Sequence, residues 1–217
     1  MSSRLFVFDL DGTLVDSVPD LMAAVNRSLA THRAPPLPRD AIAPMMGDGA
    51  RTLMERGFAA RGLTPTAAEV EAYLADYLAH VAVETRFYPG VPEGLRRLAS
   101  EGWGLAVCTN KPAAPTRALL AALGAEDWFA AVGAGDSFGA KKPDPAHLLG
   151  TVAAAGGTPA RAIMMGDHAN DIRAAQGAGM PGIFAAWGYG APQMAAGAAA
   201  LAQNFAEAAQ IAARLLP

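Results

Sequence analysis

The chain has 217 residues, enough for one large domain or for a main domain with a modest insert. Hydrophobic residues make up 52% of it and charged residues 17%, so we expect a sizeable buried core and exclude wholesale disorder. The formal net charge of -3 excludes the basic surface that nucleic acids and anionic membranes require. A small anionic ligand would therefore have to be held by a local cation.

The single cysteine and the apolar runs bear on the compartment. Cys108 is the only cysteine, so no internal disulfide can form, which suits a reducing environment. The apolar stretch before Asp9 is too short for the hydrophobic region of a signal peptide, and no run reaches the length of a membrane span. We expect a cytoplasmic monomer or homodimer with neither nucleic acid nor membrane as a partner.

Short apolar runs that end at polar residues predict buried strands of a parallel sheet. These runs span residues 5–8, 104–108, 162–165 and, more weakly, 182–185. Helical patterns lie between them, at residues 93–100, 114–123, 145–155 and 169–178. The alternation predicts a doubly wound, Rossmann-like α/β domain, in which ligands bind beyond the carboxyl ends of the strands.

One segment after the first strand breaks this alternation. From about Val18 to Val83 the sequence shows only helical periodicity, interrupted by prolines and by a Gly47-Asp48-Gly49 loop. We therefore predict an α/β core made of residues 1–16 and 86–217, with residues 17–85 as an all-helical insert.

Two carboxylates follow the first predicted strand directly. Asp9 and Asp11 are two residues apart, and the period of a strand turns both toward the same side. Their mutual repulsion requires a cation, and a site of oxygen ligands suits Mg²⁺. Gly12 permits a sharp turn and can present its N–H to an anion. The alternative is an ordinary pair of turn or capping aspartates.

Polar residues also follow the other predicted strands. Thr109 and Asn110 come after the second strand and offer a hydroxyl and backbone donors to a phosphate, although a helix cap is the alternative. Lys141-Lys142-Pro143 begins a later helix, where a solvated basic turn is the alternative. Asp167 and Asp171 follow the third strand and share one face of a helix that begins there.

These motifs together resemble those of the haloacid dehalogenase-like superfamily of phosphohydrolases. Asp9-Leu10-Asp11-Gly12-Thr13, Thr109, Lys142-Pro143 and Gly166–Asp171 occur in the family's order and in matching strand-end contexts. The resemblance covers the whole chain, and it implies that the helical insert is a cap over the α/β core.

The resemblance implies how the two carboxylates at the first strand would work. Asp9 would attack phosphorus and form an aspartyl-phosphate, which divides hydrolysis into two easier steps. Asp11 would protonate the leaving alkoxide and then deprotonate the attacking water. Relatives that cleave carbon–halogen or carbon–phosphorus bonds generally lack an aspartate at the position of Asp11, so its presence favours phosphate esters.

The resemblance also implies a metal site and a phosphate site. Mg²⁺ would be held by a side-chain oxygen of Asp9, the backbone carbonyl of Asp11 and the carboxylate of Asp167. Thr109 and Lys142 would neutralise phosphoryl oxygens. Asp171 would orient Lys142 or the metal's waters. Lys141 is the rival of Lys142, but the family places its lysine directly before the proline.

Within the superfamily the nearest likeness is to phosphoglycolate phosphatases, carried by residues 9–17, 47–51 and 87–91. The loop of residues 47–51 would close over the site, with Gly49 and Arg51 toward the substrate and Asn110 on the core side. Arg51 would pair with the carboxylate of a small substrate in a bidentate manner. A solvated arginine in a first helical turn is its alternative.

Two other functions remain open at this point. The first is another phosphotransferase of the superfamily, such as a sugar-phosphate mutase, a nucleotidase or a pyrophosphatase. The second is a phosphate-binding regulatory protein without catalysis, but such relatives usually lose Asp9 or Asp11, and both are present here. His168 follows Asp167 directly, and whether it reaches the substrate is left open.

Overall fold

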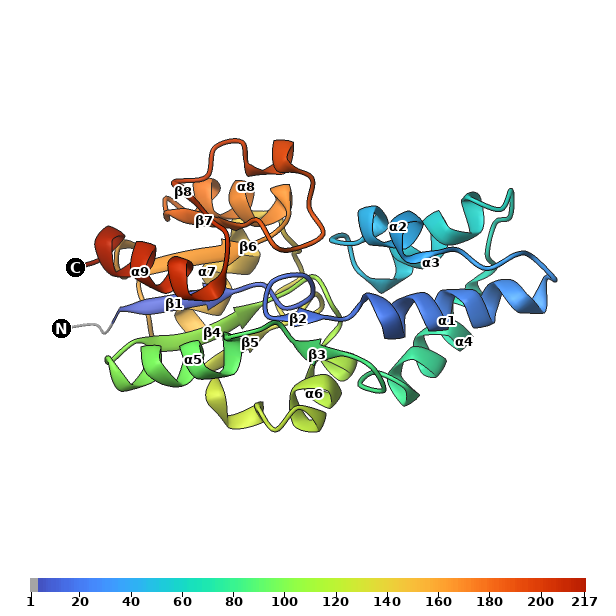
Figure 1. Cartoon of the computed structure of the whole chain (residues 1–217), viewed down its shortest axis with the longest axis horizontal. Coiled ribbons are helices and arrows are strands. Elements are labelled where there is room, and N and C mark those ends of the chain that lie inside the picture. The colour runs from blue at the N-terminus through green and yellow to red at the C-terminus, as the bar shows by residue number, and fades with distance from the viewer. Residues whose placement is uncertain (1–3) are drawn as a thin grey trace.

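The computed structural model describes residues 4–217, which form a parallel sheet with helices on both faces and a separate group of helices at one end (Figure 1). The sheet has six strands in the order β5-β4-β1-β6-β7-β8, and each neighbouring pair is parallel. Their carboxyl ends therefore meet at the same edge. The strands are β1 (Leu5–Phe8), β4 (Gly104–Cys108), β5 (Ala131–Gly133), β6 (Ala162–Gly166), β7 (Gly182–Ala185) and β8 (Ala200–Ala202).

The predicted fold class, a doubly wound α/β core with a helical insert, is confirmed. The four strands expected from the apolar runs are present, and the sheet has two more, β5 and β8. Each of these is three residues long, lies at an edge of the sheet and is partly exposed. An edge strand of this kind lacks the continuous apolar run that reveals a strand buried on both faces.

Helices cover the sheet on both faces, which explains why its central strands are apolar throughout. The helices α5 (Val91–Ser100) and α9 (Phe205–Leu215) pack together on one face, whereas α7 (Pro145–Ala154) and α8 (Ala169–Gly177) pack on the other. Along β1, Phe6 and Phe8 belong to the first of these two cores, and Leu5 and Val7 belong to the second. The helix α6 (Ala113–Ala122) follows β4.

The cap is the group of helices between β2 (Val15–Asp16) and β3 (Arg86–Phe87), which lies to the right of the core in Figure 1. It has no strand, in agreement with its helical periodicity, and its helices are α1 (Val18–Thr31), α2 (Arg39–Ile42), α3 (Ala50–Ala59) and α4 (Ala67–Ala79). Tyr73 and Tyr77 of α4 are buried among apolar residues of α1 and α3. The residue boundaries between core and cap stay a prediction.

The helix α4 shows how local sequence starts a cap helix. Thr66 precedes the helix, and its hydroxyl accepts a hydrogen bond from the N–H of Glu69 (3.3 Å). The Glu69 carboxylate accepts the N–H of Thr66 in return (2.7 Å). This capping box satisfies donors that the first turn of a helix otherwise leaves unpaired.

Two segments connect the cap to the core, and a buried carboxylate joins them. The strands β2 and β3 pair in antiparallel fashion. Asp20, in the first turn of α1, accepts hydrogen bonds from the N–H of Glu84 (3.0 Å) and from both the N–H and the hydroxyl of Thr85 (2.8 and 2.7 Å). Asp20 thereby ties the entry of the cap to its exit, a role that the sequence patterns did not reveal.

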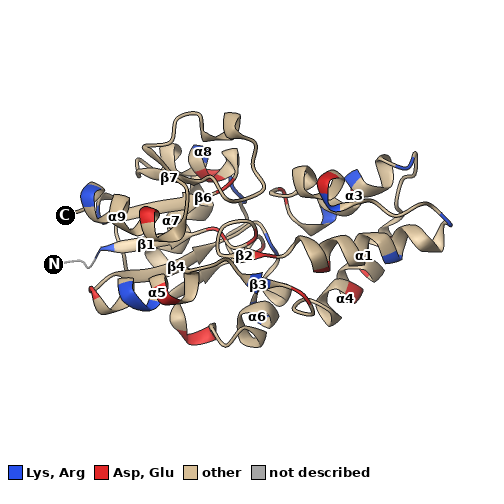
Figure 2. Ribbon diagram, viewed as in Figure 1, with Lys and Arg blue, Asp and Glu red and all other residues tan. Residues whose placement is uncertain are grey.

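The described residues also bear on membranes and charge. Among residues 4–217, no helix is both long and apolar enough to cross a bilayer. Figure 2 shows the positions of basic and acidic residues along the ribbon of both the core and the cap, in keeping with the small net charge of -3. Cys108 is buried, and burial raises the pKa of its thiol to about 11, as expected for a core residue.

Candidate active site

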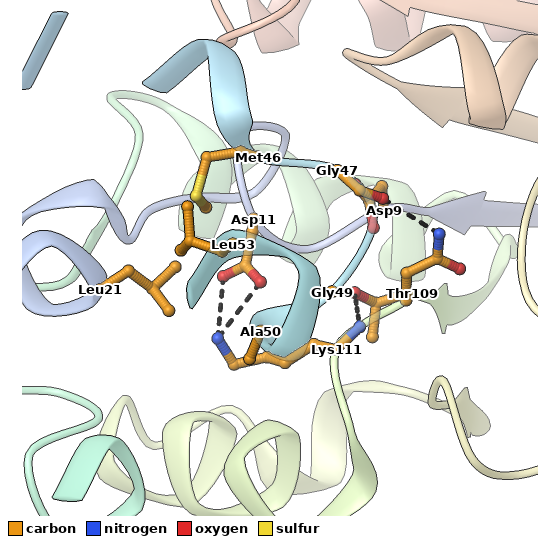
Figure 3. Close-up of a pocket in the computed structure, with 11 residues that line it drawn as sticks. Asp9, Asp11, Leu21, Met46, Gly47, Gly49, Ala50, Leu53, Thr109 and Lys111 are labelled. Carbon is orange, nitrogen blue, oxygen red and sulfur yellow. Dashed lines mark hydrogen bonds and ion pairs between the residues drawn. The ribbon is translucent and has the colours of Figure 1, made fainter. Parts of the chain in front are cut away.

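A small pocket lies between the carboxyl edge of the sheet and the cap (Figure 3). The cavity measures about 30 Å³. Its core side comes from the loops after β1 and β4, and its cap side comes from α1, α3 and the loop before α3. The residues that line it are Asp9, Asp11, Leu21, Met46, Gly47, Gly49, Ala50, Leu53, Thr109, Asn110 and Lys111.

A buried lysine holds the first carboxylate. The Lys142 ammonium lies 2.8 Å from Asp9 Oδ1 and 2.6 Å from Asp171 Oδ1, and it donates to the carbonyl of Cys108 (2.5 Å). Burial alone would lower the pKa of Lys142, but the carboxylates of Asp171 and Asp9 outweigh it and raise the pKa above its usual range. Lys142 is therefore a permanent cation paired with Asp9, and its expected contact with phosphoryl oxygens stays a prediction.

Three buried carboxylates meet beside this lysine. Oxygens of Asp9, Asp167 and Asp171 lie within 4.8 Å of one another. Burial raises the pKa of Asp9 to about 6, against the opposing effect of Lys142. Burial, followed by the charges of Asp9 and Asp171, raises the pKa of Asp167 to about 8. One lysine cannot balance three carboxylates, so this set of hard oxygen donors suits a divalent cation such as Mg²⁺.

The carboxylate of Asp167 is held by hydrogen bonds to both of its oxygens. The hydroxyl of Thr13 donates to Oδ1 (3.0 Å), and the N–H of Tyr189 donates to Oδ2 (2.8 Å). Gly12, Gly188 and Gly190 lie so close to Asp167 that a Cβ on any of them would collide with it. The loop of residues 187–190 thus belongs to the site, although no motif pointed to it.

The role expected of Gly12 needs a correction. Gly12 has a φ of +86°, the left-handed conformation that makes glycine necessary in this turn. Its N–H, however, donates to the carbonyl of Val15 (2.9 Å) and closes the turn. That donor is not available to an anion in the pocket, so Gly12 provides room for Asp167 and not a substrate contact.

Asp171 has both carboxylate oxygens in use. Oδ1 pairs with Lys142, and Oδ2 accepts the N–H of His168 (3.0 Å) at the start of α8. Of the two functions expected for Asp171, the geometry provides the first, which is the orientation of Lys142. Lys141 is exposed, whereas Lys142 is buried against Asp9, so the lysine that precedes the proline is the one in the site.

Thr109 and Asn110, which follow β4, line the pocket and also form hydrogen bonds within the protein. Thr109 lines the pocket, and its hydroxyl accepts the N–H of Lys111 (3.2 Å). The amide of Asn110 exchanges two hydrogen bonds with the backbone of Lys142 (2.9 Å each) and donates to the carbonyl of Gly47 in the cap (3.0 Å). The side chain of Asn110 therefore joins two core loops to the cap, which leaves its backbone as its means of contacting a substrate.

The cap loop lies against the core. Gly47 and Gly49 both line the pocket with positive φ angles, +105° and +95°. A Cβ on Gly49 would lie 3.1 Å from the carbonyl oxygen of Asn110, and one on Gly47 would meet the ring of His168. The side chain of Asn170 donates to Asp48 in the same loop (2.7 Å). The loop therefore lies against the core beside the pocket, and its closure over a bound substrate stays a prediction.

His168 and Arg51 lie outside the pocket lining. His168 borders a second, smaller hollow between the cap loop and residues 189–194, and burial lowers its pKa below the usual range. Arg51 is exposed on α3. In the part of the chain that the structure describes, Arg51 forms no ion pair. The contact of Arg51 with a substrate carboxylate stays a prediction, which the exposed position of the side chain does not support.

Lys111 is the residue that the sequence interpretation missed. Its ammonium lies 3.1 and 3.2 Å from the two carboxylate oxygens of Asp11, as Figure 3 shows, and it also donates to the hydroxyl of Tyr77 in the cap. Lys111 was part of the Thr109–Pro112 stretch. Its partners, however, lie in other elements, which no local pattern could reveal.

These features define the class of the protein. A charged site at the carboxyl edge of a doubly wound sheet, closed by a helical cap and suited to a divalent cation, is the site of an α/β enzyme. The chain belongs to the haloacid dehalogenase-like hydrolase family, whose profile matches residues 4–179.

Relatives and solved structures agree with this membership. The chain is 45% identical over 194 residues to a phosphoglycolate phosphatase of Caulobacter vibrioides, and the aligned region covers 87% of this chain and 81% of that protein. A phosphoglycolate phosphatase of Agrobacterium fabrum is 42% identical, with 86% and 82% covered. The crystal structure of a predicted phosphoglycolate phosphatase from Haemophilus somnus superimposes with a TM-score of 0.87 at 30% identity, covering 97% of this chain and 98% of that one.

A further solved structure is that of CbbY from Rhodobacter sphaeroides in complex with phosphate, with a TM-score of 0.80 at 26% identity and 94% and 96% covered. Together with the family match, these likenesses confirm the predicted resemblance and the predicted enzyme class, phosphoric monoester hydrolase.

Proposed function

We propose that this enzyme hydrolyses 2-phosphoglycolate in a Mg²⁺-dependent reaction, through an aspartyl-phosphate formed on Asp9. The observation that carries the proposal is the buried ion pair between Asp9 and Lys142 (2.8 Å), next to Asp167, with Asp9 lining the pocket. A carboxylate that is held by a fixed cation, inside a cavity that also contains a second carboxylate, has the composition that nucleophilic phosphoryl transfer requires.

Asp9 and Asp11 divide the reaction between them. In the first step a carboxylate oxygen of Asp9 bonds to phosphorus, the bond from phosphorus to the ester oxygen breaks, and Asp11 gives its proton to that oxygen. In the second step Asp11 removes a proton from water, the water oxygen bonds to phosphorus, and the bond to Asp9 breaks. Phosphate leaves, and Asp11 is protonated again, ready for the next substrate.

The remaining residues of the core hold and neutralise the phosphoryl group. Lys142 keeps Asp9 oriented and faces the phosphoryl oxygens, and Asp171 fixes Lys142 from behind. Thr109 lines the pocket on the side of β4 and supplies donors there. Asp9, Asp167 and the backbone of Asp11 would hold Mg²⁺, which when bound supplies positive charge to the phosphoryl oxygens.

Two facts support 2-phosphoglycolate as the substrate. The relatives described above are phosphoglycolate phosphatases at 45% and 42% identity. The side chains on the cap side of the pocket, those of Leu21, Met46, Ala50 and Leu53, are apolar and offer no hydrogen bonds to the hydroxyls of a sugar.

A substrate panel tests the proposal. Phosphate release is measured with Mg²⁺ against 2-phosphoglycolate, β-glucose 1-phosphate, nucleoside monophosphates, pyrophosphate and p-nitrophenyl phosphate. We expect the highest kcat/KM for 2-phosphoglycolate. A higher value for any other member of the panel would overturn the substrate and would favour one of the other phosphotransferases of the superfamily.

The covalent step is tested by Asp9→Asn, which keeps the shape of the side chain and removes the nucleophilic charge. We expect phosphate release from p-nitrophenyl phosphate to fall by at least about 10³-fold. Hydrolysis at the wild-type rate would exclude an intermediate on Asp9 and would leave only phosphate binding for the other residues of the site. Localisation in the cytoplasm and the state of a monomer or homodimer stay predictions.

A further inference from the structure

We propose that Lys111, and not Arg51, is the cation that recognises the carboxylate of the substrate, and that Tyr77 of the cap holds it in place. This inference rests on the proposed function and assigns the substrate's second charge to a residue. It depends on where the ammonium of Lys111 lies, on what surrounds it, and on the length of 2-phosphoglycolate.

Lys111 is the one cationic side chain that lines the pocket among residues 4–217. Its side chain is only 3% exposed, so its charge acts inside the cavity and not in bulk water. Lys142 is directed to Asp9 and Asp171 on the other side of Asp9, where it serves the phosphoryl group. A second anionic group of a substrate therefore has Lys111 as its partner in this cavity.

The position of Lys111 matches the short distance between the two ends of the substrate. Its ammonium lies 3.1 Å from Asp11, the group that gives a proton to the ester oxygen. In 2-phosphoglycolate one methylene separates that ester oxygen from the carboxylate carbon. An ester oxygen in contact with Asp11 thus places the carboxylate within reach of Lys111. The apolar side chains of Leu21 and Leu53 lie nearby to cover the methylene.

The cap and the core both fix this ammonium. The hydroxyl of Tyr77 accepts a hydrogen bond from it, and the ammonium lies 4.5 Å from the centre of the Tyr77 ring. The backbone of Lys111 is held as well, since its N–H donates to Thr109 and its carbonyl accepts the N–H of Gly135 (2.8 Å). Lys111 is a preorganised cation, which reduces the ordering cost of binding an anion.

Without substrate, Asp11 is the partner that balances Lys111. A substrate carboxylate would take over part of this contact, because three hydrogens on the ammonium can serve Asp11, Tyr77 and one further oxygen. A substrate without the carboxylate leaves the ammonium with Asp11 and Tyr77 as its partners. The cavity therefore discriminates between acidic and neutral leaving groups by an ion pair in a partly apolar environment.

The test compares two substrates on one preparation of each variant: 2-phosphoglycolate, and 2-hydroxyethyl phosphate, in which a neutral hydroxymethyl group replaces the carboxylate. In Lys111→Met we expect kcat/KM for 2-phosphoglycolate to fall about 10- to 100-fold more than kcat/KM for 2-hydroxyethyl phosphate. The ratio of the two values does not depend on how much of the variant folds. Tyr77→Phe keeps the ring and removes the hydroxyl. In this variant we expect kcat/KM for 2-phosphoglycolate to fall about 3- to 10-fold more than kcat/KM for 2-hydroxyethyl phosphate.

A matched control removes a positive charge from outside the pocket. Arg117→Met likewise removes one positive charge, from an exposed arginine on α6. In this variant we expect the ratio of the two kcat/KM values to equal that of the wild type. Equal losses on both substrates in Lys111→Met would show that Lys111 serves only Asp11 and would overturn the inference. A preference that survives in Lys111→Met and disappears in Arg51→Met would overturn it as well.

The same measurements separate this inference from the proposed function. A wild-type enzyme that shows no preference for 2-phosphoglycolate over 2-hydroxyethyl phosphate would overturn both. A wild-type preference that Lys111→Met leaves intact would overturn only the assignment of Lys111.

Discussion

The two walls of the pocket are built on different principles. On the core wall, the charged side chains Asp9 and Lys142 and their neighbour Asp171 are buried, and each is held by partners from other core loops. On the cap wall, Leu21 and Leu53 present apolar surface without a charge. The difference indicates that the core supplies the charged groups of the pocket, Lys111 included, whereas the cap supplies apolar surface and, through Tyr77, a partner for Lys111.

The two walls also differ in how they are held. The core wall stands at the ends of parallel strands, where a shift of the backbone would disturb the whole sheet. The cap wall depends on a loop with two glycines at positive φ, Gly47 and Gly49, and on the clamp that Asp20 forms with Thr85. Changes at Asp9 or Lys142 should therefore abolish activity, whereas changes at Lys111 or in the cap wall should alter preference or stability.

The largest expected effect lies on the core wall, in Lys142→Met. Removing this cation leaves Asp9 and Asp171 without their common partner. It also removes a positive charge that would neutralise the phosphoryl oxygens of the substrate. We expect kcat for p-nitrophenyl phosphate to fall by about 10³-fold. Lys141→Met, one residue away and exposed, is the matched control and should stay within about 3-fold of the wild type. A larger loss of kcat in Lys141→Met than in Lys142→Met would show that Lys141, and not Lys142, acts in the site.

The next effect concerns the connection between the walls, in Asp20→Ala. The substitution leaves two buried donors of Thr85 and the part-buried N–H of Glu84 without an acceptor. We expect the free energy of unfolding to fall by about 3 kcal/mol, measured by urea denaturation. Asp40→Ala, at an exposed aspartate of α2, should change it by less than about 0.5 kcal/mol. Equal effects of the two substitutions would exclude the clamp.

A smaller effect, dependent on pH, is expected from Asp167→Asn in the absence of divalent cations. The pKa of Asp167 is about 8 in the folded protein, against an ordinary 3.8. Between these values the folded state keeps a proton that the unfolded state has released, so this group makes the wild type less stable as the pH rises from about 4 to about 8. Asp167→Asn has no titratable carboxyl group at this position, so it does not lose this stability as the pH rises.

The measurement is the difference in unfolding free energy between Asp167→Asn and the wild type at several pH values. We expect the variant to become more stable relative to the wild type as the pH rises. Addition of Mg²⁺ should raise the unfolding free energy of the wild type but not that of the variant. A difference that is independent of pH would mean that the Asp167 carboxylate is not destabilised by its surroundings.

The smallest effect is expected at the cap, in Arg51→Ala. The side chain is exposed and lies outside the pocket lining, so kcat/KM for 2-phosphoglycolate should stay within about 2-fold of the wild type. Steady-state kinetics on both proteins measure this. A tenfold loss would show that the cap turns Arg51 toward the substrate when it binds, as the sequence alone had suggested.

Sequence patterns were sufficient for the α/β core and for most of the polar residues of its wall. Asp9, Thr109 and Asp167 each follow a buried strand directly, and parallel strands bring their carboxyl ends to one edge without further information. The short edge strands β5 and β8 escaped because three partly exposed residues carry too little apolar pattern. The turn at Gly12 was expected, but the partner of its N–H was not.

The sequence by itself therefore determined the fold class, the helical character of the cap and the core wall of the site, because those features depend on local periodicity and on residues at strand ends. Only the tertiary structure decided which cation faces the pocket. Lys111 meets Tyr77 across 34 residues of sequence, and Arg51 turns to solvent, through the packing of α3 and α4 against their neighbours. The rotation of a helix about its axis follows from such packing, and no motif encodes it.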